Sequence, residues 1–485
     1  VLLDSPHCTG DMIALAERLF HRGVNVHLFA IEHRFYGESF PQNNNNGYHL
    51  RGSENEDGSD FHDVDFSHLS SRQAVKDVIN FVQSSDAAQK TSSSSNASSS
   101  EVRWITFGGS YPGMLSAWCH LLHPDVIFAA VSSSSPIQAQ LDNYGYNDIV
   151  NSDLGDESVG GSEECQRIFR EGHQAVVATM EGENDDEAED DGEDGLDRVA
   201  ELFNVCDGGD ALRASRRNQE AFVGDGLFYV PAQSNDPACE GGLCNIEKIC
   251  KAMIDEKESN QGISSMEILA TIKNLKNHGD EDCTNVNWGA YLLYLKTPTN
   301  LNANDRSWMY QTCSEFGFYL TCNQDSECPY GRGYHDVNQD LEMCQEVFGI
   351  DPSDVENNVD STLSYYGGWS LTPNTTGEDK VRPKNAPLGL SEGSLEYDGQ
   401  KRLIFAYGSV DPWTALAVTS GNEDHPSVGV AGASHHFWTH QVKDSDAEEV
   451  RAARQTIYET VEGWLGLSTE GLPSIGGETV VFEKE

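Results

Sequence analysis

Gly108-Gly-Ser-Tyr-Pro-Gly113 stands between two apolar stretches, residues 102–107 and residues 114–122. The first stretch predicts a buried strand and the second a helix, so Ser110 falls on a sharp strand-to-helix turn. A serine on such a turn is presented as a nucleophile. Pro112 replaces the second glycine of a strict Gly-x-Ser-x-Gly pattern, but proline is favoured at the first position of a helix, so the expected geometry is kept. An ordinary glycine-rich turn is the alternative that this hexapeptide alone leaves open.

Two later segments supply the partners that such a serine needs. Asp411 lies in Tyr407-Gly-Ser-Val-Asp-Pro-Trp413, and His435 lies in Ser434-His-His436. A serine hydroxyl becomes a nucleophile when an imidazole takes its proton and a carboxylate holds that imidazole in the right tautomer. Ser110, Asp411 and His435 fit these roles in the chain order that α/β-hydrolases use. The backbone N–H of Tyr111 is the expected first oxyanion donor.

Three other interpretations of these later segments remain. Asp411 could mark a simple turn, the two histidines could lie on the surface, or they could form a metal site with His440. No glutamate stands between His436 and His440 at the position that a zincin requires. Catalysis is therefore the favoured interpretation, and neither a metal nor a cofactor is expected.

Alternating helix-like and strand-like segments surround the motifs and predict an α/β fold. Strand-like segments are expected at 24–31, 126–131, 403–407 and 428–430, and helices at 11–21, 67–82 (capped by Ser70 or Ser71) and 447–465. From 147 to 387 the pattern changes to cysteine-linked helical segments separated by long polar loops. The expected organisation is an α/β-hydrolase core at 1–146 and 388–485 with an inserted, mostly helical, disulfide-rich cap at 147–387. The polar segments 43–60 and 92–100 are expected to be surface loops.

The composition limits the partners and the compartment. A formal charge of −48 argues against nucleic acid and anionic membranes, and no apolar run is long enough for a transmembrane helix. Ten of the twelve cysteines lie between Cys165 and Cys344, which indicates a disulfide framework, whereas their irregular spacing disfavours zinc. Asn96-Ala-Ser98 and Asn374-Thr-Thr376 are glycosylation acceptor triplets. The expected location is the secretory pathway, ending in a lysosome, a vacuole or outside the cell.

The motifs resemble a family of serine peptidases, the serine carboxypeptidases that include lysosomal Pro-X carboxypeptidase, dipeptidyl peptidase II and thymus-specific serine protease. The resemblance covers most of the chain and looks closest to the thymus-specific branch. It is carried by Glu32-His-Arg-Phe-Tyr-Gly-Glu-Ser39, Gly108–Gly113, Tyr310-Gln-Thr-Cys-Ser-Glu-Phe-Gly-Phe-Tyr319, Tyr365-Tyr-Gly-Gly368, Asp411–Trp413 and Ser434–His436.

This resemblance implies an exopeptidase that acts next to proline, with Ser110 as nucleophile, Asp411 as orienting acid and His435 as base. It also implies a proline pocket at Met114, Phe318 and Trp413, although core packing is an equal alternative for Met114. Glu315 is a candidate for holding a free amine, with a structural role as the alternative. Cys322 with Cys328 and Cys313 with Cys344 are the disulfide pairs that the resemblance suggests.

Several choices stay open at this point. The chain is expected to begin at about the family's N-terminal glycine-rich turn, so the second oxyanion donor is expected to be missing or altered. A catalytically impaired glycoprotein acting as a binding protein and an esterase are the alternative functions. Carboxypeptidase and dipeptidyl-peptidase activity cannot be separated, and the oligomeric state is left open, with a homodimer as the candidate. Peptides, and proline-containing ones in particular, are the expected partners.

Overall fold

The computed structural model describes residues 10–41, 64–84, 102–182, 194–276, 283–297, 302–374 and 401–467. The chain separates into two compact units, each described by itself below. Unit 1 comprises Val1–Gln42, Asp65–Ala139 and Asp360–Glu485, and unit 2 comprises Asn43–Val64 and Gln140–Val359. The loops expected at 43–60 and 92–100, together with Asn96, lie outside the described residues.

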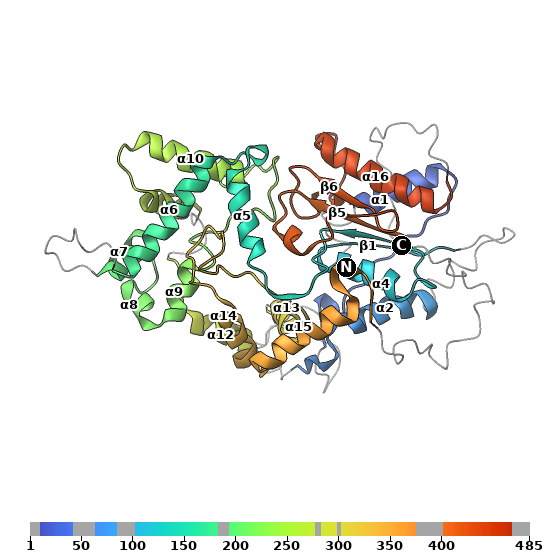
Figure 1. The fold of residues 1–485 in the computed structure, drawn as a ribbon, viewed down its shortest axis with the longest axis horizontal. Helices are drawn as coiled ribbons and strands as arrows, with labels where there is room; N and C mark the ends of the chain where they lie inside the picture. The colour runs from blue at the N-terminus through green and yellow to red at the C-terminus, as the bar shows by residue number, and fades with distance from the viewer. Residues whose placement is uncertain are drawn as a thin grey trace. The chain divides into compact units, whose positions relative to one another are not determined.

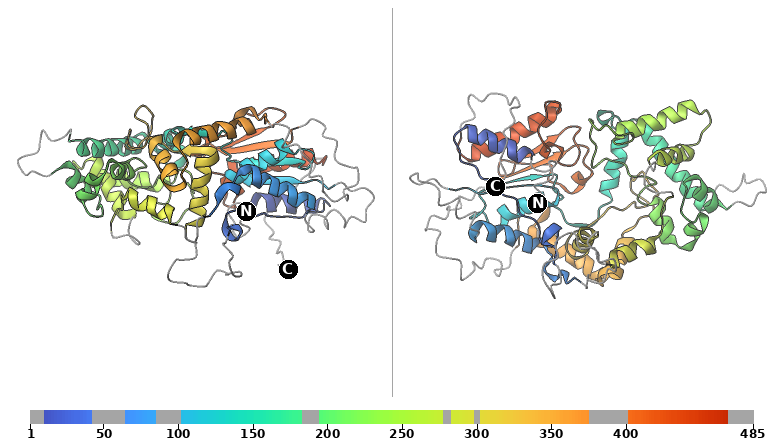
Figure 2. Two further views of the ribbon diagram at one scale, coloured as in Figure 1. Left: turned by 90° about the horizontal axis from the view of Figure 1, so that it is seen from below. Right: turned by 180° about the vertical axis from the view of Figure 1, so that it is seen from behind.

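Unit 1 is built on a four-stranded parallel sheet with the strand order β1-β2-β5-β6. The strands are β1 Ile105–Gly109, β2 Ala129–Ser133, β5 Leu403–Gly408 and β6 Ser427–Val430. Helices α1 (Gly10–His21) and α16 (Glu448–Trp464) cover one face, and α2 (Ser71–Ser84) and α4 (Tyr111–Leu122) cover the other (Figures 1 and 2). Parallel strands covered on both faces are expected to be buried and mostly apolar, as β5 is, whereas β2 is buried but ends in two serines.

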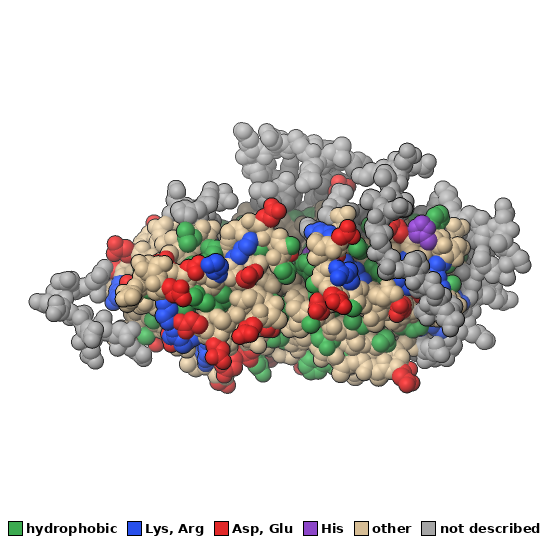
Figure 3. Space-filling view, turned by 90° about the horizontal axis from the view of Figure 1, so that it is seen from above, with side chains coloured by type: hydrophobic (Ala, Val, Ile, Leu, Met, Phe, Trp, Pro, Cys, Tyr) green, Lys and Arg blue, Asp and Glu red, His purple; other side chains and the backbone are tan. Residues whose placement is uncertain are grey.

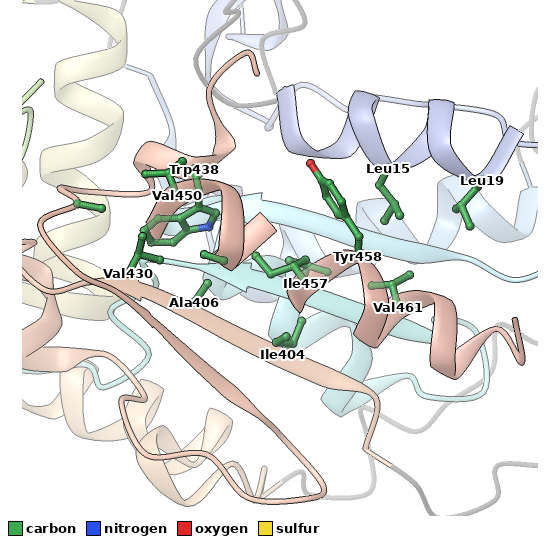
Figure 4. Packing of buried hydrophobic residues seen from close by; sticks show 13 residues of the cluster. Leu15, Leu19, Ile404, Ala406, Val430, Trp438, Val450, Ile457, Tyr458 and Val461 are labelled. Carbon is green, nitrogen blue, oxygen red and sulfur yellow. The ribbon is translucent and has the colours of Figure 1, made fainter. Parts of the chain in front are cut away.

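The core between the sheet and the α1/α16 layer explains the amphipathic pattern of α16. Val450, Ala453, Ile457 and Val461 are buried along one stripe of that helix and belong to one cluster with Ile404 of β5. Figure 4 shows Val450, Ile457 and Val461 on the side of α16 that faces the sheet. Leu15 and Leu19 of α1 belong to the same cluster. On the opposite face, Tyr366 stacks on Trp118 of α4 with ring centroids 3.6 Å apart. Its hydroxyl also hydrogen-bonds to the Ser71 hydroxyl, at 2.9 Å, so the Tyr365–Gly368 motif ties α2 to α4.

The expectation of a strand at 24–31 is wrong, because these residues form no ladder in the described structure. Val24 and Val26 pack against the core, and Phe29 contacts Trp104 with ring centroids 5.6 Å apart. The apolar pattern therefore reports side-chain burial and not backbone pairing. The other expected elements of unit 1 are present with shifted ends. Helix α2, for example, begins at Ser71, where the Ser70 hydroxyl accepts the Gln73 N–H at 3.3 Å.

Short three-residue helical turns complete the described part of unit 1. These are η1 Gly37–Ser39, η2 Phe66–His68, η7 Gly368–Ser370 and η9 Phe437–Thr439, together with the five-residue η8 Pro412–Leu416.

Unit 2 is mostly helical. Its helices are α5 Gly145–Gly155, α6 Glu163–Met180, α7 Gly195–Leu202, α8 Gly209–Ala214, α9 Arg216–Val223, α10 Ile246–Ser259, α11 Ser265–Lys276, α12 Trp288–Lys296, α13 Ala303–Gln311 and α14 Val337–Met343, and α15 Pro352–Tyr366 continues into unit 1. Shorter helical turns are η3 Glu157–Val159, η5 Thr312–Phe316 and η6 Cys344–Phe348. A small parallel sheet pairs β3 (Gln140–Asp142) with β4 (Gly317–Tyr319).

Five disulfides join all ten cysteines between Cys165 and Cys344. They are Cys165–Cys250, Cys206–Cys283, Cys239–Cys244, Cys313–Cys344 and Cys322–Cys328. The two pairs suggested by the family resemblance are thus confirmed. Bridges across long loops restrict the unfolded chain most, so Cys165–Cys250, with a separation of 85 residues, is expected to stabilise unit 2 strongly.

The described surface mixes charges of both signs. Figure 3 shows acidic and basic side chains interspersed over one face, where no continuous basic area is visible among the residues that are coloured. Arginines pair with several acids at once, as Arg213 does with Asp194, Asp197 and Asp210. Among the described helices, none has the length and apolar character needed to cross a membrane. The α/β class, with a disulfide-rich helical second unit, is confirmed.

Candidate active site

The three candidate catalytic residues follow strands that end at one edge of the unit 1 sheet. Because the four strands are parallel, the loops that follow them leave from the same edge. Ser110 follows β1, Asp411 follows β5, and His435 lies in the loop after β6. Ser132 and Ser133 end β2, which lies between the strands that lead to the serine and to the aspartate, and Ser134 and Ser135 follow it. The topology alone therefore brings the three distant segments to one place.

Ser110 has an unusual backbone conformation. Its φ of 60° and ψ of −131° lie in a region that side-chain-bearing residues rarely adopt. The Ser110 N–H donates to the Ser133 carbonyl at 2.8 Å, and helix α4 begins at the next residue. A Cβ atom on Gly108 would lie 2.1 Å from the Pro112 carbonyl oxygen, so this turn requires glycine there. Strain of this kind is typical of residues held in place for function.

Asp411 and His435 form a buried hydrogen-bonded pair. The Nδ1 of His435 lies 2.9 Å from each carboxylate oxygen of Asp411, and the two side chains are 4% and 1% exposed. The carboxylate can only accept, so Nδ1–H is the donor. Asp411 also accepts the Trp413 N–H at 3.0 Å, which caps η8. This arrangement leaves the Nε2 of His435 with a lone pair, able to take a proton.

That Nε2 atom is buried and has no hydrogen-bond partner among the described residues. Such orphaned polar atoms are uncommon in folded proteins and often mark a reactive group. The adjacent residue, His436, packs its ring on Gly109: a Cβ atom there would lie 3.0 Å from the His436 Cγ. His436 therefore places the histidine loop directly against the residue that precedes Ser110.

Buried serines at and just after the end of β2 hydrogen-bond to the turn at Ser110 and to the loop that carries His435. These serines were not identified from the sequence. Ser133 accepts the Ser110 N–H through its carbonyl and the Trp438 indole N–H, at 3.0 Å, through its hydroxyl. The Ser134 hydroxyl accepts the His436 N–H at 2.8 Å. Four consecutive serines directly after an expected strand were the available signal. Apolar side chains are usual at such buried positions, whereas hydroxyls there indicate hydrogen-bonding partners.

The adjacent His436 adds no positive charge beside His435. Burial, followed by the proximity of His435 and His440, holds the pKa of His436 well below its ordinary value. A neutral His436 does not oppose the positive charge that His435 acquires when it takes a proton. The rings of His435 and His436 lie 4.6 Å apart, and the ring of Trp413 lies 6.3 Å from that of His435.

The expected pocket residues are divided between the two units. Met114, on α4, is fully buried, and Trp413 is half-buried. Glu315 and Phe318 belong to unit 2, where both are buried. Glu315 accepts a hydrogen bond from Gln311 at 3.1 Å, and Phe318, with φ 67°, stacks on Phe316 with ring centroids 5.4 Å apart. Within the described ranges, no three His, Cys, Asp or Glu side chains are placed to hold a metal ion.

The family model and the similar proteins all point to one family of serine peptidases. The model of the family "Serine carboxypeptidase S28" matches residues 9–377, more than half of the chain. The chain is 29% identical to thymus-specific serine protease of Mus musculus over 454 residues, covering 90% of this chain and 74% of that protein. The human protein gives the same identity over 452 residues, covering 91% and 74%. Lysosomal Pro-X carboxypeptidase of Bos taurus is 22% identical over 475 residues, covering 94% and 77%. The chain therefore belongs to the serine carboxypeptidase S28 family, whose α/β-hydrolase fold it shares, and it is a serine peptidase.

Proposed function

We propose that this peptidase is an exopeptidase that cleaves peptide bonds next to proline, with Ser110, His435 and Asp411 as its catalytic residues. The observation that carries the catalytic part is the buried Asp411–His435 pair, whose unpartnered Nε2 lies in a loop packed against the nucleophile turn. A general base in a serine peptidase needs this combination of a fixed tautomer and a free lone pair.

The geometry supports an acyl-enzyme route. Ser110 Oγ attacks the scissile carbonyl carbon while its proton passes to His435 Nε2, and Asp411 stabilises the resulting imidazolium. The Tyr111 N–H, directly after the nucleophile, stabilises the oxyanion. His435 then gives the proton to the leaving amine, the C–N bond breaks, and Ser110 carries the acyl group. Water, deprotonated by the same Nε2, hydrolyses the ester and restores the enzyme.

Preference for proline is supported by a relative and by Trp413. The name of the bovine relative states Pro-X carboxypeptidase activity for that protein. The half-buried Trp413 ring, close to His435, offers an apolar face that suits a pyrrolidine ring. Met114, also in unit 1, remains a candidate for this pocket. Glu315 and Phe318, in unit 2, remain candidates for contacts with the substrate. Glu315 would have to exchange its bond from Gln311 for a substrate amine.

The setting of the enzyme is also part of the proposal. We assign unit 2 the role of the inserted cap, and Asn374, which is exposed, the role of a glycan acceptor. Five disulfides indicate an oxidising compartment, and the secretory pathway provides one. Delivery to a lysosome or a vacuole, or release from the cell, would follow from that route.

A digestion experiment tests the substrate assignment. Three peptides share one sequence with an internal proline and are blocked at the amino end, at the carboxyl end or at both. Each is incubated with the enzyme and with the Ser110→Ala variant, and the products are identified by mass spectrometry. We expect cleavage beside proline of one singly blocked peptide only, and none of the doubly blocked peptide. Trp413→Ala should raise KM for the proline peptide roughly fivefold, because one aromatic contact is worth about 1 kcal/mol. Cleavage of all three peptides, or equal cleavage when alanine replaces proline, would refute the proposal.

A further inference from the structure

The motif Glu32–Ser39 has no part in the proposed mechanism, yet its loop is tightly fixed. Glu32 accepts the Ser39 N–H at 2.7 Å and the Glu38 N–H at 3.2 Å, which closes the loop on itself. Gly37, with φ 56°, lies so close that a Cβ atom there would be 2.0 Å from the Glu32 Oε1. The loop therefore depends on both residue types at these two positions.

Arg34 anchors the same loop to helix α2. Its Nε donates to Asp77 Oδ2 at 2.7 Å and its second terminal nitrogen donates to Asp77 Oδ1 at 2.6 Å. The remaining nitrogen donates to the His68 carbonyl at 3.0 Å. A two-point guanidinium–carboxylate contact fixes direction as well as distance. The backbone on either side of His33 is thereby held in place.

His33 connects this fixed loop to the turn that carries Ser110. Its Nε2 lies 3.0 Å from the Tyr111 hydroxyl, and Tyr111 is the residue directly after Ser110. The His33 Nδ1 lies 2.6 Å from the Arg34 carbonyl oxygen. The imidazole ring is also packed between Tyr111, at 5.4 Å, and Tyr36, at 5.1 Å, measured between ring centroids.

The two hydrogen bonds define the tautomer of His33. A carbonyl oxygen can only accept, so Nδ1 must carry the hydrogen. Burial lowers the pKa of His33 to about 4, a shift that the charge of Arg34 favours and that of Asp77 opposes, so the ring is neutral above that pH. Nε2 then has a lone pair and accepts the Tyr111 O–H.

We propose that His33 is a positioning residue that holds the Tyr111 side chain, and through it the backbone N–H that serves as oxyanion donor. This role rests on the proposed function, since it assumes that Ser110 is the nucleophile. An oxyanion donor acts only when it is aimed at the developing charge, and small displacements of catalytic groups cost large factors in rate. The strained Ser110 conformation makes the first turn of α4 dependent on such outside support.

Four variants test the role. His33→Phe keeps the ring and removes the acceptor, His33→Gln restores an acceptor near the Nε2 position, Tyr111→Phe removes the donor, and the fourth combines His33→Phe with Tyr111→Phe. We expect kcat to fall roughly 10- to 100-fold in His33→Phe with KM changed less than about threefold, because the lost bond acts in the transition state. His33→Gln should recover most of the loss. The double variant should be no worse than either single variant, since both remove one interaction.

His120→Gln is the matched control. His120 is also a buried histidine of unit 1 whose Nδ1 contacts a carbonyl, that of Ile127 at 2.8 Å, and whose Nε2 accepts an N–H, that of Arg402 at 3.0 Å. It lies towards the opposite end of α4 from Ser110. Its loss should lower the melting temperature without the kcat defect. If His33→Phe does not fold, Tyr111→Phe and His33→Gln carry the comparison.

The outcomes separate the two levels of the proposal. Histidine-labelled Ser110→Ala protein provides an NMR readout that needs no activity: the His33 signal should report an Nδ1–H tautomer, and Tyr111→Phe should raise the His33 pKa. An Nε2–H tautomer, additive effects in the double variant, or wild-type kcat in His33→Phe would overturn the positioning role alone. Wild-type protein that neither cleaves proline peptides nor reacts with a fluorophosphonate would overturn the proposed function and this role together.

Discussion

Replacing Asp411 by asparagine tests the pairing at the centre of the site with almost no change of shape. The carboxylate is fully buried and accepts three contacts: two from the Nδ1–H of His435 and one from the Trp413 N–H. Trp413 bonds to Oδ1, so the asparagine oxygen is expected to keep that position and the NH2 group to replace Oδ2, 2.9 Å from Nδ1. The His435 Nδ1–H would then face a second donor at the Oδ2 position, and only the neutral amide oxygen at Oδ1, also 2.9 Å from Nδ1, would be left to accept it. The conflict is relieved when the histidine hydrogen moves to Nε2, the atom that must receive the proton of Ser110.

The expected loss follows from this change of tautomer. By analogy with the aspartate of other serine-protease triads, kcat should fall by about 10⁴-fold, which at 1.36 kcal/mol per decade is roughly 5 kcal/mol of transition-state stabilisation. The rate at which a fluorophosphonate modifies the protein measures the loss of nucleophile activation without assuming a substrate. Thermal unfolding checks that the variant is folded. Asp424→Asn, at an exposed position, is the control and should react at the wild-type rate. A loss of less than tenfold in a correctly folded Asp411→Asn protein would refute the reasoning.

Further predictions concern stability. The free energy of unfolding of Ser110→Gly should exceed that of Ser110→Ala by roughly 1 kcal/mol, because glycine adopts φ 60° without strain. Equal melting temperatures of the two variants would contradict this. Gly108→Ala should lower the free energy of unfolding in urea by roughly 1–3 kcal/mol, because the new Cβ would overlap the Pro112 carbonyl. Gly463→Ala is the control and should not lower it, because the space around Gly463 on α16 is open. Burial raises the pKa of Asp11 from 3.8 to about 7, so this residue favours the folded state at low pH and loses that contribution as pH rises from 4 to 7. Asp11→Asn should therefore raise the melting temperature at pH 8 and leave it unchanged at pH 4; an equal shift at both values would contradict the assignment.

Sequence patterns predict the elements that depend on residues close together in the chain. The glycine-flanked turn at Ser110, the apolar strand β5 and the stripe of α16 are readable because each depends on residues a few positions apart. The segment 24–31 was misread because its apolar residues pack into the core without a strand partner. Hydrophobic periodicity reports which side chains are buried, and pairing depends on which backbone lies alongside.

Long-range features needed the structure. His33 and Tyr111 are 78 positions apart, and nothing near either residue signals the other. The serines after β2 likewise hold loops that lie about 300 positions away, as in the contact between Ser134 and His436. The parallel order of the strands brings Asp411 and His435 to the same sheet edge, and chain order alone could only suggest that the two residues meet.

The identity of the reactive residue tests the central claim most directly. Folded protein is treated with a fluorophosphonate, digested without removing the label, and the modified peptide is sequenced by mass spectrometry, with Asp411→Asn and Ser110→Ala treated in parallel. A single adduct on Ser110, slow to form in the first variant and absent from the second, is the predicted result. A folded wild-type protein that takes up no label, or takes it up on another serine, would contradict the account.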